Sequence, residues 1–476
     1  MTTRRQFLKQ VGAATAGLAV SNVSNAFAHP MTAKEWQSAK SDKVKVAYIG
    51  IGNRGLQDIQ AFEKTGMVDV VALCDVDLDG QQCQKALSMY PNALRFRDFR
   101  DMLEKSADKF DAVIAAVPDH IHFPIAMAAL AHGKHVYLEK PMVRTFQEAE
   151  ILMDMARRHP KLATQVGNQG HSEANYFQFK AWKEAGIIKD VTAVTAHMND
   201  ARRWHNFSAD IHKFPDADPL PKDMDWNTWL GACQWHDYSE KFHQGNWRCW
   251  YDFGMGALGD WGAHILDTIH EFLDLGLPYE VTMKYANGHN DFFYPYSSTI
   301  LFRFAARKGM PPCDITWYDG IDNLPPLPKG YGQSIGTSDI PKTNQGNTAN
   351  NTLHPGKIIY SKNLTFKGGS HSSTLRIIPD EKAEEMKNKL PEVPKSPSNH
   401  FKNFLLACQG KEKTRSPFEV NGVLSQVFCL GVIAQRLNTQ LLFDPKTKRF
   451  TNNDFANALL VGLPPRKGWE DYYKLK

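Results

Sequence analysis

Three residues from distant parts of the chain could together remove a proton from an alcohol. Asp260 and His264 are four residues apart, which places them on one face of a predicted helix. A carboxylate in that position can orient the imidazole or stabilise its charged form. Lys140 stands between Glu139 and Pro141 at a predicted strand end and could hydrogen-bond the same hydroxyl. The residue types fit general acid–base chemistry at a carbinol, and they leave open whether Lys140 or His264 accepts the proton.

A glycine-rich turn predicts a dinucleotide site. The run Gly50-Ile51-Gly52-Asn53-Arg54-Gly55 follows a predicted strand, opens a predicted helix, and precedes Asp75 at the end of the next strand. Glycines let the backbone approach a pyrophosphate, the helix N-terminus offers free N–H groups, and a carboxylate accepts hydrogen bonds from ribose hydroxyls. Asp75 would repel a 2′-phosphate, which favours NAD, while Arg54 keeps NADP open. A tight turn beside a surface aspartate would not explain the joint spacing.

The elements around this turn alternate between strand and helix. Apolar and amphipathic patterns predict strands at 44–49, 68–74, 111–117, 134–138 and 162–166, separated by helices at 56–64, 80–89, 122–131 and 146–158. Such alternation is typical of a parallel, doubly wound sheet. The sequence therefore predicts an α/β fold with a Rossmann dinucleotide-binding domain at 43–166.

After residue 167 the regular alternation stops. Helices are predicted at 172–185, 258–275, 399–407 and 420–436, and strands at 191–197, 281–285 and 298–304. This pattern indicates an α+β domain with a mainly antiparallel sheet over 167–476, for substrate binding and oligomerisation. We expect its C-terminal helices, about 399–436, to pack back toward the first domain. The stretch 309–356 is rich in Gly, Pro, Asn and Thr and predicts a long surface excursion.

The N-terminus has the pattern of a twin-arginine export signal over residues 1–28. Arg4 and Arg5 precede an Ala- and Gly-rich stretch, and Ala26-Phe27-Ala28 supplies a cleavage site. The apolar stretch is too short to span a membrane, and no later segment is apolar enough. We expect an exported, periplasmic protein without a membrane span once the signal is removed.

Composition excludes several classes of protein. The 476 residues are 42% hydrophobic and 22% charged, which is typical of a globular chain and not of a disordered one. The formal net charge of +5 falls to +2 without the three basic residues of the leader, too little to indicate a nucleic-acid partner. Seven scattered cysteines contain no C-x-x-C pair, so neither a zinc ribbon nor a disulfide framework is indicated.

Three motifs together identify a family resemblance. They are the glycine turn, Val117-Pro118-Asp119-His120-Ile121-His122 with the later Glu139-Lys140-Pro141, and a D-x-x-x-H pattern within Gly259–Asp267. From about Lys43 to Arg436 the chain resembles the Gfo/Idh/MocA oxidoreductases. Members of that family typically oxidise a carbohydrate or cyclitol hydroxyl with a nicotinamide cofactor and commonly form homo-oligomers.

The resemblance implies roles for particular residues. The catalytic group would be Lys140, Asp260 and His264. The residues expected to bind the cofactor are Gly50, Gly52, Asn53, Arg54, Gly55, Asp75, Pro118, His122, Glu139 and Lys140. The residues expected to bind the substrate are Gln169, His171, Trp247, Arg248, Asp260 and His264. For His122 a packing or helix-capping role is an equal alternative.

Aromatic residues are concentrated between Trp204 and Trp261, a segment with seven of the eleven tryptophans and several histidines. Indole faces stack on sugar C–H surfaces, so a carbohydrate cleft fits the pattern, and so does packing of these rings in a core. No H-x-x-x-H cluster with an adjoining carboxylate occurs in the segment, and we predict no metal site.

Export and a dinucleotide motif in one chain have a joint consequence. An exported enzyme meets no pool of soluble NAD, so the cofactor is expected to be tightly bound and regenerated in place, and the organisation is similar to that of glucose-fructose oxidoreductase. The intact Glu139-Lys140-Pro141 favours oxidation of a sugar, sugar derivative or cyclitol hydroxyl. The alternatives are a redox-neutral NAD-dependent glycosidase acting through a transient keto-sugar and, more distantly, a non-catalytic sugar binder. The sequence does not identify the sugar.

Overall fold

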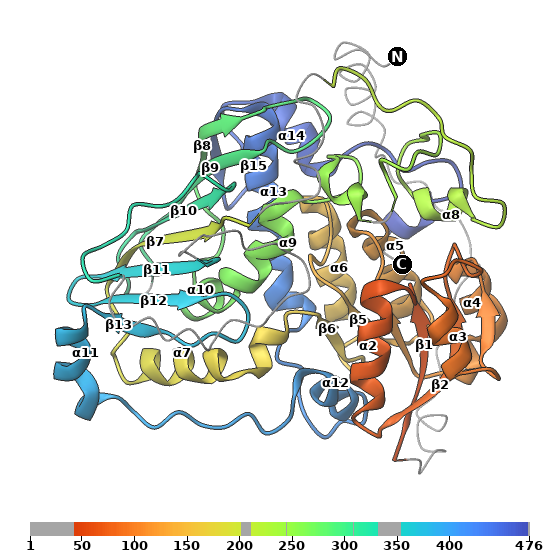
Figure 1. The fold of residues 1–476 in the computed structure, drawn as a ribbon, viewed down its shortest axis with the longest axis horizontal. Helices are drawn as coiled ribbons and strands as arrows, with labels where there is room; N and C mark the ends of the chain where they lie inside the picture. The colour runs from red at the N-terminus through yellow and green to blue at the C-terminus, as the bar shows by residue number, and fades with distance from the viewer. Residues whose placement is uncertain (1–41, 201–210, 244, 308, 332–353, 475–476) are drawn as a thin grey trace.

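The chain folds around two β-sheets, which the ribbon places on opposite sides of a group of helices (Figure 1). The computed structural model describes residues 42–200, 211–243, 245–307, 309–331 and 354–474. The predicted export signal at 1–28 lies outside the described residues, as do Trp204 and His205.

The first sheet has six parallel strands in the order β3-β2-β1-β4-β5-β6, with helices on both faces. The strands are β1 Val44–Ile49, β2 Val68–Cys74, β3 Leu94–Phe96, β4 Ala112–Ala115, β5 His135–Leu138 and β6 Thr164–Val166. The helices are α2 Asn53–Glu63, α3 Gln84–Met89, α4 Phe99–Ser106, α5 His122–Ala131 and α6 Phe146–Arg158. This sheet confirms the predicted doubly wound Rossmann fold.

The second sheet has nine strands in the order β13-β12-β11-β7-β10-β9-β8-β14-β15. Only β7 and β10 pair in parallel among its described strands, which confirms a mainly antiparallel sheet. Its strands are β7 Val191–Met198, β8 Glu280–Asn287, β9 Ser297–Phe304, β10 Cys313–Asp319, β11 Gly356–Ser361, β12 Thr365–Gly369, β13 Arg376–Ile378, β14 Gln440–Asp444 and β15 Arg449–Phe450. The helices of this half are α7 Ala174–Glu184, α8 Trp226–Leu230, α9 Gly256–Ile265, α10 Asp267–Phe272, α11 Asp380–Met386, α12 His400–Cys408, α13 Phe418–Leu437 and α14 Asp454–Val461.

The predicted surface excursion at 309–356 is wrong in its first part. Strand β10 lies inside the second sheet, between β7 and β9. Its side chains alternate, with Cys313, Ile315 and Trp317 buried, which is the two-residue period of a strand with one face in the core. The Gly and Pro residues just before Cys313 are typical of a loop, and the alternating run that follows them is too short to predict a strand against that signal. A second difference is that the predicted helix 258–275 is two helices, α9 and α10, which meet at Leu266.

The two C-terminal helices α12 and α13 join the two halves of the molecule. On α12, Phe404 packs edge-on against Phe62 of α2 and against Tyr137 of β5. Helix α13 packs along α6 of the first half and α9 of the second. The expectation that no segment after the leader is apolar enough to cross a membrane is wrong for α13, the one described helix that is long and apolar enough, and most of this helix is buried in the protein core.

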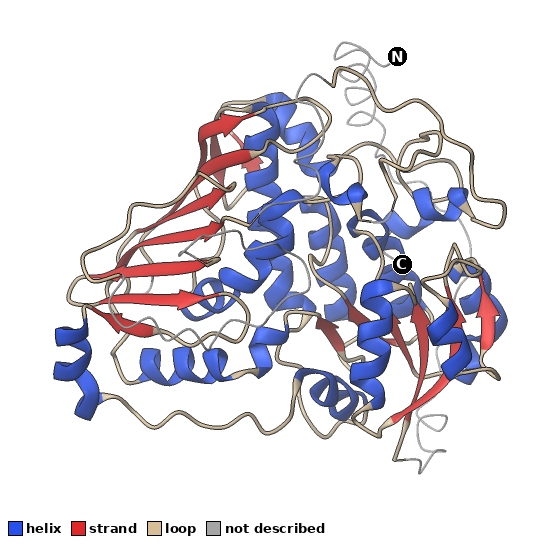
Figure 2. Ribbon diagram, in the orientation of Figure 1, coloured by secondary structure: helices blue, strands red, loops and turns tan. Residues whose placement is uncertain are grey.

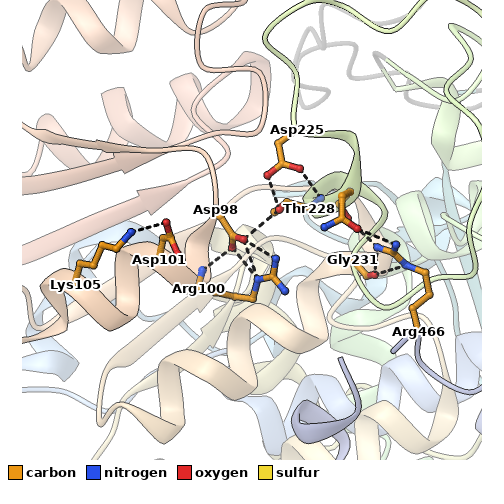
Figure 3. A network of polar contacts seen from close by, with 9 residues as sticks. Asp98, Arg100, Asp101, Lys105, Asp225, Thr228, Gly231 and Arg466 are labelled. Atoms are coloured by element: carbon orange, nitrogen blue, oxygen red, sulfur yellow. Dashed lines mark hydrogen bonds and ion pairs between the residues drawn. The ribbon is translucent and has the colours of Figure 1, made fainter. Parts of the chain in front are cut away.

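The segment before α9 is anchored to the Rossmann half by a polar network (Figure 3). Asp98 caps α4 through the Arg100 N–H and also accepts a hydrogen bond from the Thr228 hydroxyl, 3.3 Å away. Thr228 in turn belongs to the first turn of α8, which Asp225 caps. From the C-terminal tail, the Arg466 guanidinium donates to the Gly231 carbonyl at 2.6 and 3.0 Å. These contacts hold in place the region of the chain that leads to Arg248.

Candidate active site

The centre of the candidate site is an ion pair between the two halves of the molecule. Lys140 follows β5, and its Nζ lies 2.7 Å from Asp260 Oδ1 and 3.0 Å from the Asp260 carbonyl on α9. Both side chains are largely buried, at 14% and 13% exposed. The structure therefore brings together two of the three predicted catalytic residues, which are 120 positions apart in the sequence.

Arg248 supplies a second cation to Asp260. Its guanidinium lies 3.5 Å from Asp260 Oδ1 and 3.2 Å from Asp119 Oδ1, and it rests on the ring of Trp247, 4.3 Å from the centroid. Burial would lower the pKa of Arg248, but the carboxylates of Asp260 and Asp119 outweigh it and raise that pKa. Trp247 and Arg248, both predicted to bind substrate, are thus part of the same charged group as Lys140.

His264 lies one helical turn after Asp260, and its ring is stacked on His371. The ring centroids are 4.0 Å apart with 18° between the planes, and the His371 N–H donates to the His264 carbonyl at 3.1 Å. Burial lowers the pKa of His264 to well below its usual value, His371 and Lys140 lower it further, and the charge of Asp260 only partly opposes them. His264 is therefore a neutral imidazole at neutral pH.

Sequence reasoning missed His371. It lies in the turn between β12 and β13, more than a hundred residues after His264, with a positive φ of 53°. Burial lowers its pKa to about 4, and the nearby charge of Lys140 lowers it further while Asp260 opposes this. No local motif marks the run Gly369-Ser370-His371, and the only signal for this residue is a contact that forms when the second sheet folds.

The glycine turn has the features a dinucleotide needs. Gly50 has φ +77°, and a Cβ there would lie 2.3 Å from the Ala116 carbonyl oxygen. No side chain caps the N-terminus of α2 and its first turn contains no acidic residue, so its N–H groups remain available to a phosphate. Asp75 accepts the Ile51 N–H at 2.9 Å and the Asp77 N–H at 3.0 Å. These bonds fix a carboxylate beside the turn and leave each oxygen a second lone pair for a ribose hydroxyl.

Arg54 forms its ion pairs with Glu139 and Asp58. Its guanidinium lies 2.9 Å from Glu139 Oε1 and 2.8 Å from Asp58 Oδ1. These two carboxylates raise its pKa against the effect of burial. The ion pairs connect the first turn of α2 with the residue before Lys140. Arg54 and Glu139 therefore hold the glycine turn close to the loop that carries Lys140.

His122 is placed for packing rather than for contact with a cofactor. The side chain is completely buried, with Nδ1 2.7 Å from the Pro141 carbonyl oxygen and Nε2 2.9 Å from the Val117 carbonyl oxygen. Burial lowers its pKa to about 4. His122 thus ties the loop after Lys140 to the end of β4, beside Pro118, and this geometry favours the structural alternative.

The turn 167–171 contacts helix α9 through the side chain of Asn168. Asn168 donates to the Ala263 carbonyl at 3.0 Å, next to His264, and Gln169 is half-buried beside it. His171 is buried and faces Asp267 at 3.5 Å and Glu271 at 3.3 Å. Its Nδ1 is hydrogen-bonded to the Arg415 carbonyl at 3.0 Å, and the predicted contact with substrate stays a prediction.

Most of the tryptophans belong to a core. Trp226 and Trp229 stack at 4.4 Å, and both pack with Trp250 in one buried aromatic cluster. Among the described tryptophans, Trp247 lies against Arg248 of the site, and Trp261 packs edge-on against His371. Within the described ranges, no group of three or more His, Cys, Asp or Glu side chains is arranged to hold a metal ion.

Asp119 is a second residue that sequence reasoning did not assign to the site. It begins a short 3₁₀ helix after β4 and is 1% exposed. Its carboxylate accepts hydrogen bonds from Arg248 at 3.2 Å and from the Met255 N–H at 3.0 Å. Burial raises its pKa from 3.8 to about 6, although Arg248 opposes this. Asp119 positions Arg248 from the Rossmann side.

The raised pKa of Asp119 predicts a pH-dependent stability difference. Because the folded protein holds this proton more tightly than the unfolded chain, ionisation of Asp119 costs stability as the pH rises from about 4 to about 6. We expect wild type to lose stability relative to Asp119→Asn over this range, measured by urea unfolding. A difference in unfolding free energy between wild type and Asp119→Asn that stays constant from pH 4 to pH 7 would contradict this.

Family models match both halves of the chain. The model of an oxidoreductase family with an NAD-binding Rossmann fold, Gfo/Idh/MocA, matches residues 44–168. The model of that family's C-terminal alpha/beta domain matches residues 178–306 and 361–471. Together these matches cover well over half of the chain.

Curated relatives share part of the sequence. A glycosyl hydrolase family 109 protein of Shewanella baltica strain OS155 is 34% identical over 221 residues, 42% of this chain and 47% of that protein. An alpha-N-acetylgalactosaminidase of Shewanella oneidensis is 31% identical over 181 residues, 35% of this chain and 39% of that protein. The chain thus spans about half the length, or less, of the curated relatives it matches.

Solved structures share the fold over most of the chain. The WlbA dehydrogenase of Chromobacterium violaceum, in complex with NADH and UDP-GlcNAcA, has a TM-score of 0.57 at 15% identity and covers 85% of this chain and 97% of its own. The aldose-aldose oxidoreductase of Caulobacter crescentus, complexed with glycerol, has a TM-score of 0.53 at 13% identity, with 84% and 100% covered.

Proposed function

The chain belongs to the Gfo/Idh/MocA oxidoreductase family, and from this premise we propose that it oxidises a hydroxyl of a sugar, sugar derivative or cyclitol with NAD. The observation that carries the proposal is the Lys140–Asp260 ion pair. It places an amine at the carboxyl end of β5, the edge of a doubly wound sheet where ligands bind, and joins it to the helix that bears His264.

The residues of the site divide the work of removing the hydroxyl proton. Lys140, held by Asp260, donates a hydrogen bond to the substrate oxygen and stabilises negative charge that develops there. His264 is neutral and presents an imidazole that can take a proton. Asp119 and Trp247 hold Arg248 beside Asp260, where it can hydrogen-bond a neighbouring hydroxyl. NAD, when bound, supplies the hydride acceptor.

NAD is proposed over NADP because of where Arg54 lies. Its guanidinium is committed to Glu139 and Asp58, so it does not offset the charge of Asp75. A carboxylate in that position accepts hydrogen bonds from ribose hydroxyls and repels a 2′-phosphate. The cofactor is proposed to stay bound through export by the twin-arginine route, because a periplasmic enzyme has no pool of soluble NAD.

A redox-neutral glycosidase is the second candidate. The curated relatives at 31 to 34% identity are named as glycosyl hydrolase family 109 proteins or as an alpha-N-acetylgalactosaminidase. Such an activity would use the same proton and hydride transfers, reversed after the glycosidic bond has broken. Lys140, Asp260 and His264 would act on the ring hydroxyl in both cases, so the residues of the site are common to the two candidates.

The experiment that tests the proposal begins with the bound dinucleotide. We expect extensively dialysed mature protein to release near-stoichiometric NAD on denaturation, measured by mass spectrometry. The intact protein is then mixed with an aldose panel that includes N-acetylgalactosamine, and with p-nitrophenyl N-acetyl-α-galactosaminide. Reduction of the bound NAD by a free sugar supports the oxidoreductase.

Each other outcome assigns a different function. Release of p-nitrophenol without net NADH would identify the glycosidase. Protein that contains no dinucleotide and binds none would exclude both candidates and leave a sugar binder. Protein that holds NADP in place of NAD would contradict the argument from Asp75 and Arg54.

A further inference from the structure

A pocket lies at the junction of the two halves, and none of Lys140, Asp260 and His264 lines it. It is enclosed by the start of α6, the segment around 232–234, Tyr251 and Asp252, and helices α13 and α14 with the chain that follows them. Its cavity volume of about 60 Å³ accommodates roughly four to six water molecules. The pocket is therefore large enough for a small organic molecule.

Arg144 lines this pocket without a direct counter-ion. One of its terminal nitrogens donates to the Tyr251 carbonyl at 3.4 Å and the other faces Cys233 Sγ at 4.0 Å. Its Nε is buried and has no hydrogen-bond partner among the described residues. No described carboxylate lies within 4.0 Å of the guanidinium, although burial of a cation ordinarily requires a nearby negative charge. Arg144 is thus a charged donor with unused capacity.

The two acidic residues of the pocket are engaged elsewhere. Glu148 accepts hydrogen bonds from the Tyr473 hydroxyl at 2.9 Å and from the Thr145 N–H at 3.1 Å. Asp252 lies 2.9 Å from His236 Nε2, and its hydrogen bond to that ring holds its pKa below the usual value despite burial. These carboxylates offset the charge of Arg144 at a distance and leave its Nε–H unpaired.

Two further groups shape the pocket for an oxyanion. The Tyr251 hydroxyl is buried and has no hydrogen-bond partner among the described residues. The Arg436 guanidinium lies over the same ring, 5.1 Å from its centroid. Ile433 and Leu459 supply apolar lining. The combination is two guanidinium groups, an unused hydroxyl and an apolar wall.

We propose that this pocket binds a small organic carboxylate, with the carboxylate toward Arg144 and Tyr251 and a short apolar tail toward α13 and α14. The apolar lining favours a carboxylate over inorganic phosphate, and the two share the chemistry of an oxyanion. The site does not depend on the proposed reaction, because none of its lining residues belongs to the Lys140 group.

The test is calorimetric titration of the full mature protein with propionate, inorganic phosphate and propionamide at constant ionic strength. We expect saturable binding of propionate, weaker binding of phosphate and none of propionamide, which has nearly the same shape without the charge. Arg144→Gln is expected to weaken propionate binding roughly tenfold or more, because it removes a charge-assisted donor. Tyr251→Phe keeps the ring and is expected to weaken binding several-fold.

Arg158→Gln is the matched control, because Arg158 is an exposed arginine in the last turn of α6, the helix that begins two residues after Arg144, and should leave binding unchanged. If Arg144→Gln fails to fold, Tyr251→Phe still decides the question. Equal affinity for propionate and propionamide, or an affinity unaffected by Tyr251→Phe and Arg144→Gln, would overturn the proposal. If phosphate bound more tightly than propionate, the ligand would be an inorganic anion and not an organic carboxylate. If neither anion showed saturable binding, the site would be excluded.

Discussion

Replacing Lys140 with methionine is expected to lower kcat for sugar oxidation about a thousandfold, within the range for a lost proton-transferring or alkoxide-stabilising group. Methionine keeps the length and apolar body of the side chain but cannot hydrogen-bond the substrate oxygen. Asp260 would retain Arg248 as a neighbouring cation, at 3.5 Å, so the local charge is not left without a partner. The measurement is single-turnover reduction of the retained NAD by the sugar found in the aldose panel.

The result separates chemistry from cofactor loss because the NAD content of Lys140→Met is measured on the same sample and is expected to match wild type. Lys105→Met is the control: it breaks an ion pair of the same length, 2.7 Å to Asp101, but on the exposed surface of α4. That variant should react at the wild-type rate. A Lys140→Met protein that keeps more than about a tenth of the wild-type rate would remove Lys140 from the proton-transfer group.

The same variant informs the choice between the two candidate functions. Both an oxidoreductase and a redox-neutral glycosidase need proton removal from a ring hydroxyl, so Lys140→Met should abolish whichever activity the wild type shows. Loss of sugar oxidation with retention of glycoside cleavage would mean that cleavage proceeds without a keto-sugar. That outcome would separate the two activities onto different residues.

Local sequence predicted five of the six strands of the Rossmann half and the residues at their ends, but not the three-residue strand β3 or helix α4. The predicted strands are short apolar runs, such as β1 and β2, bounded by glycines or charged residues. The glycine turn also has a fixed spacing to Asp75. Helical spacing likewise predicted that Asp260 and His264 share a face of α9. These features depend on neighbours within about twenty residues, which a single sequence displays.

The features that were missed depend on long-range contacts. His371 reaches His264 only because β12 and β13 pair with one another at the edge of the second sheet. Asp119 becomes a site residue only when the segment carrying Arg248 docks on the Rossmann half. Strand β10 was hidden because its alternation is short and follows a Gly- and Pro-rich stretch. The hydrogen bond of the buried His171 ring is likewise long-range, because it joins Nδ1 to the Arg415 carbonyl, 244 positions away.

Two alanine substitutions in the glycine turn are expected to separate cofactor binding from folding. At Gly55 a Cβ would lie 1.8 Å from the Gly50 carbonyl oxygen, a backbone atom that cannot move aside without opening the turn. We therefore expect Gly55→Ala to lose about 3 kcal/mol or more of unfolding free energy, together with its NAD. At Gly52 the nearest atom is Cγ of Gln82, 2.6 Å away on a flexible side chain.

Gly52→Ala should cost less, about 1 to 2 kcal/mol, because Gln82 Cγ can rotate away, while Gln82 Cβ stays at 3.1 Å and the hydrogen bond from Gln82 to Asp77 is lost. Its added methyl group nevertheless stands at the N-cap of α2, where a phosphate must approach free N–H groups closely. The loss of two such charge-assisted hydrogen bonds corresponds to a fall in NAD affinity of about a hundredfold. Urea unfolding and titration of the cofactor-free proteins with NAD measure the two effects separately.

Gly66→Ala is the control: a Cβ there meets no atom within 4 Å, although its φ of +70° carries a modest conformational cost. If Gly52→Ala bound NAD as tightly as Gly66→Ala, the turn would not be the phosphate site, and the family's dinucleotide chemistry would have to be located elsewhere in this chain.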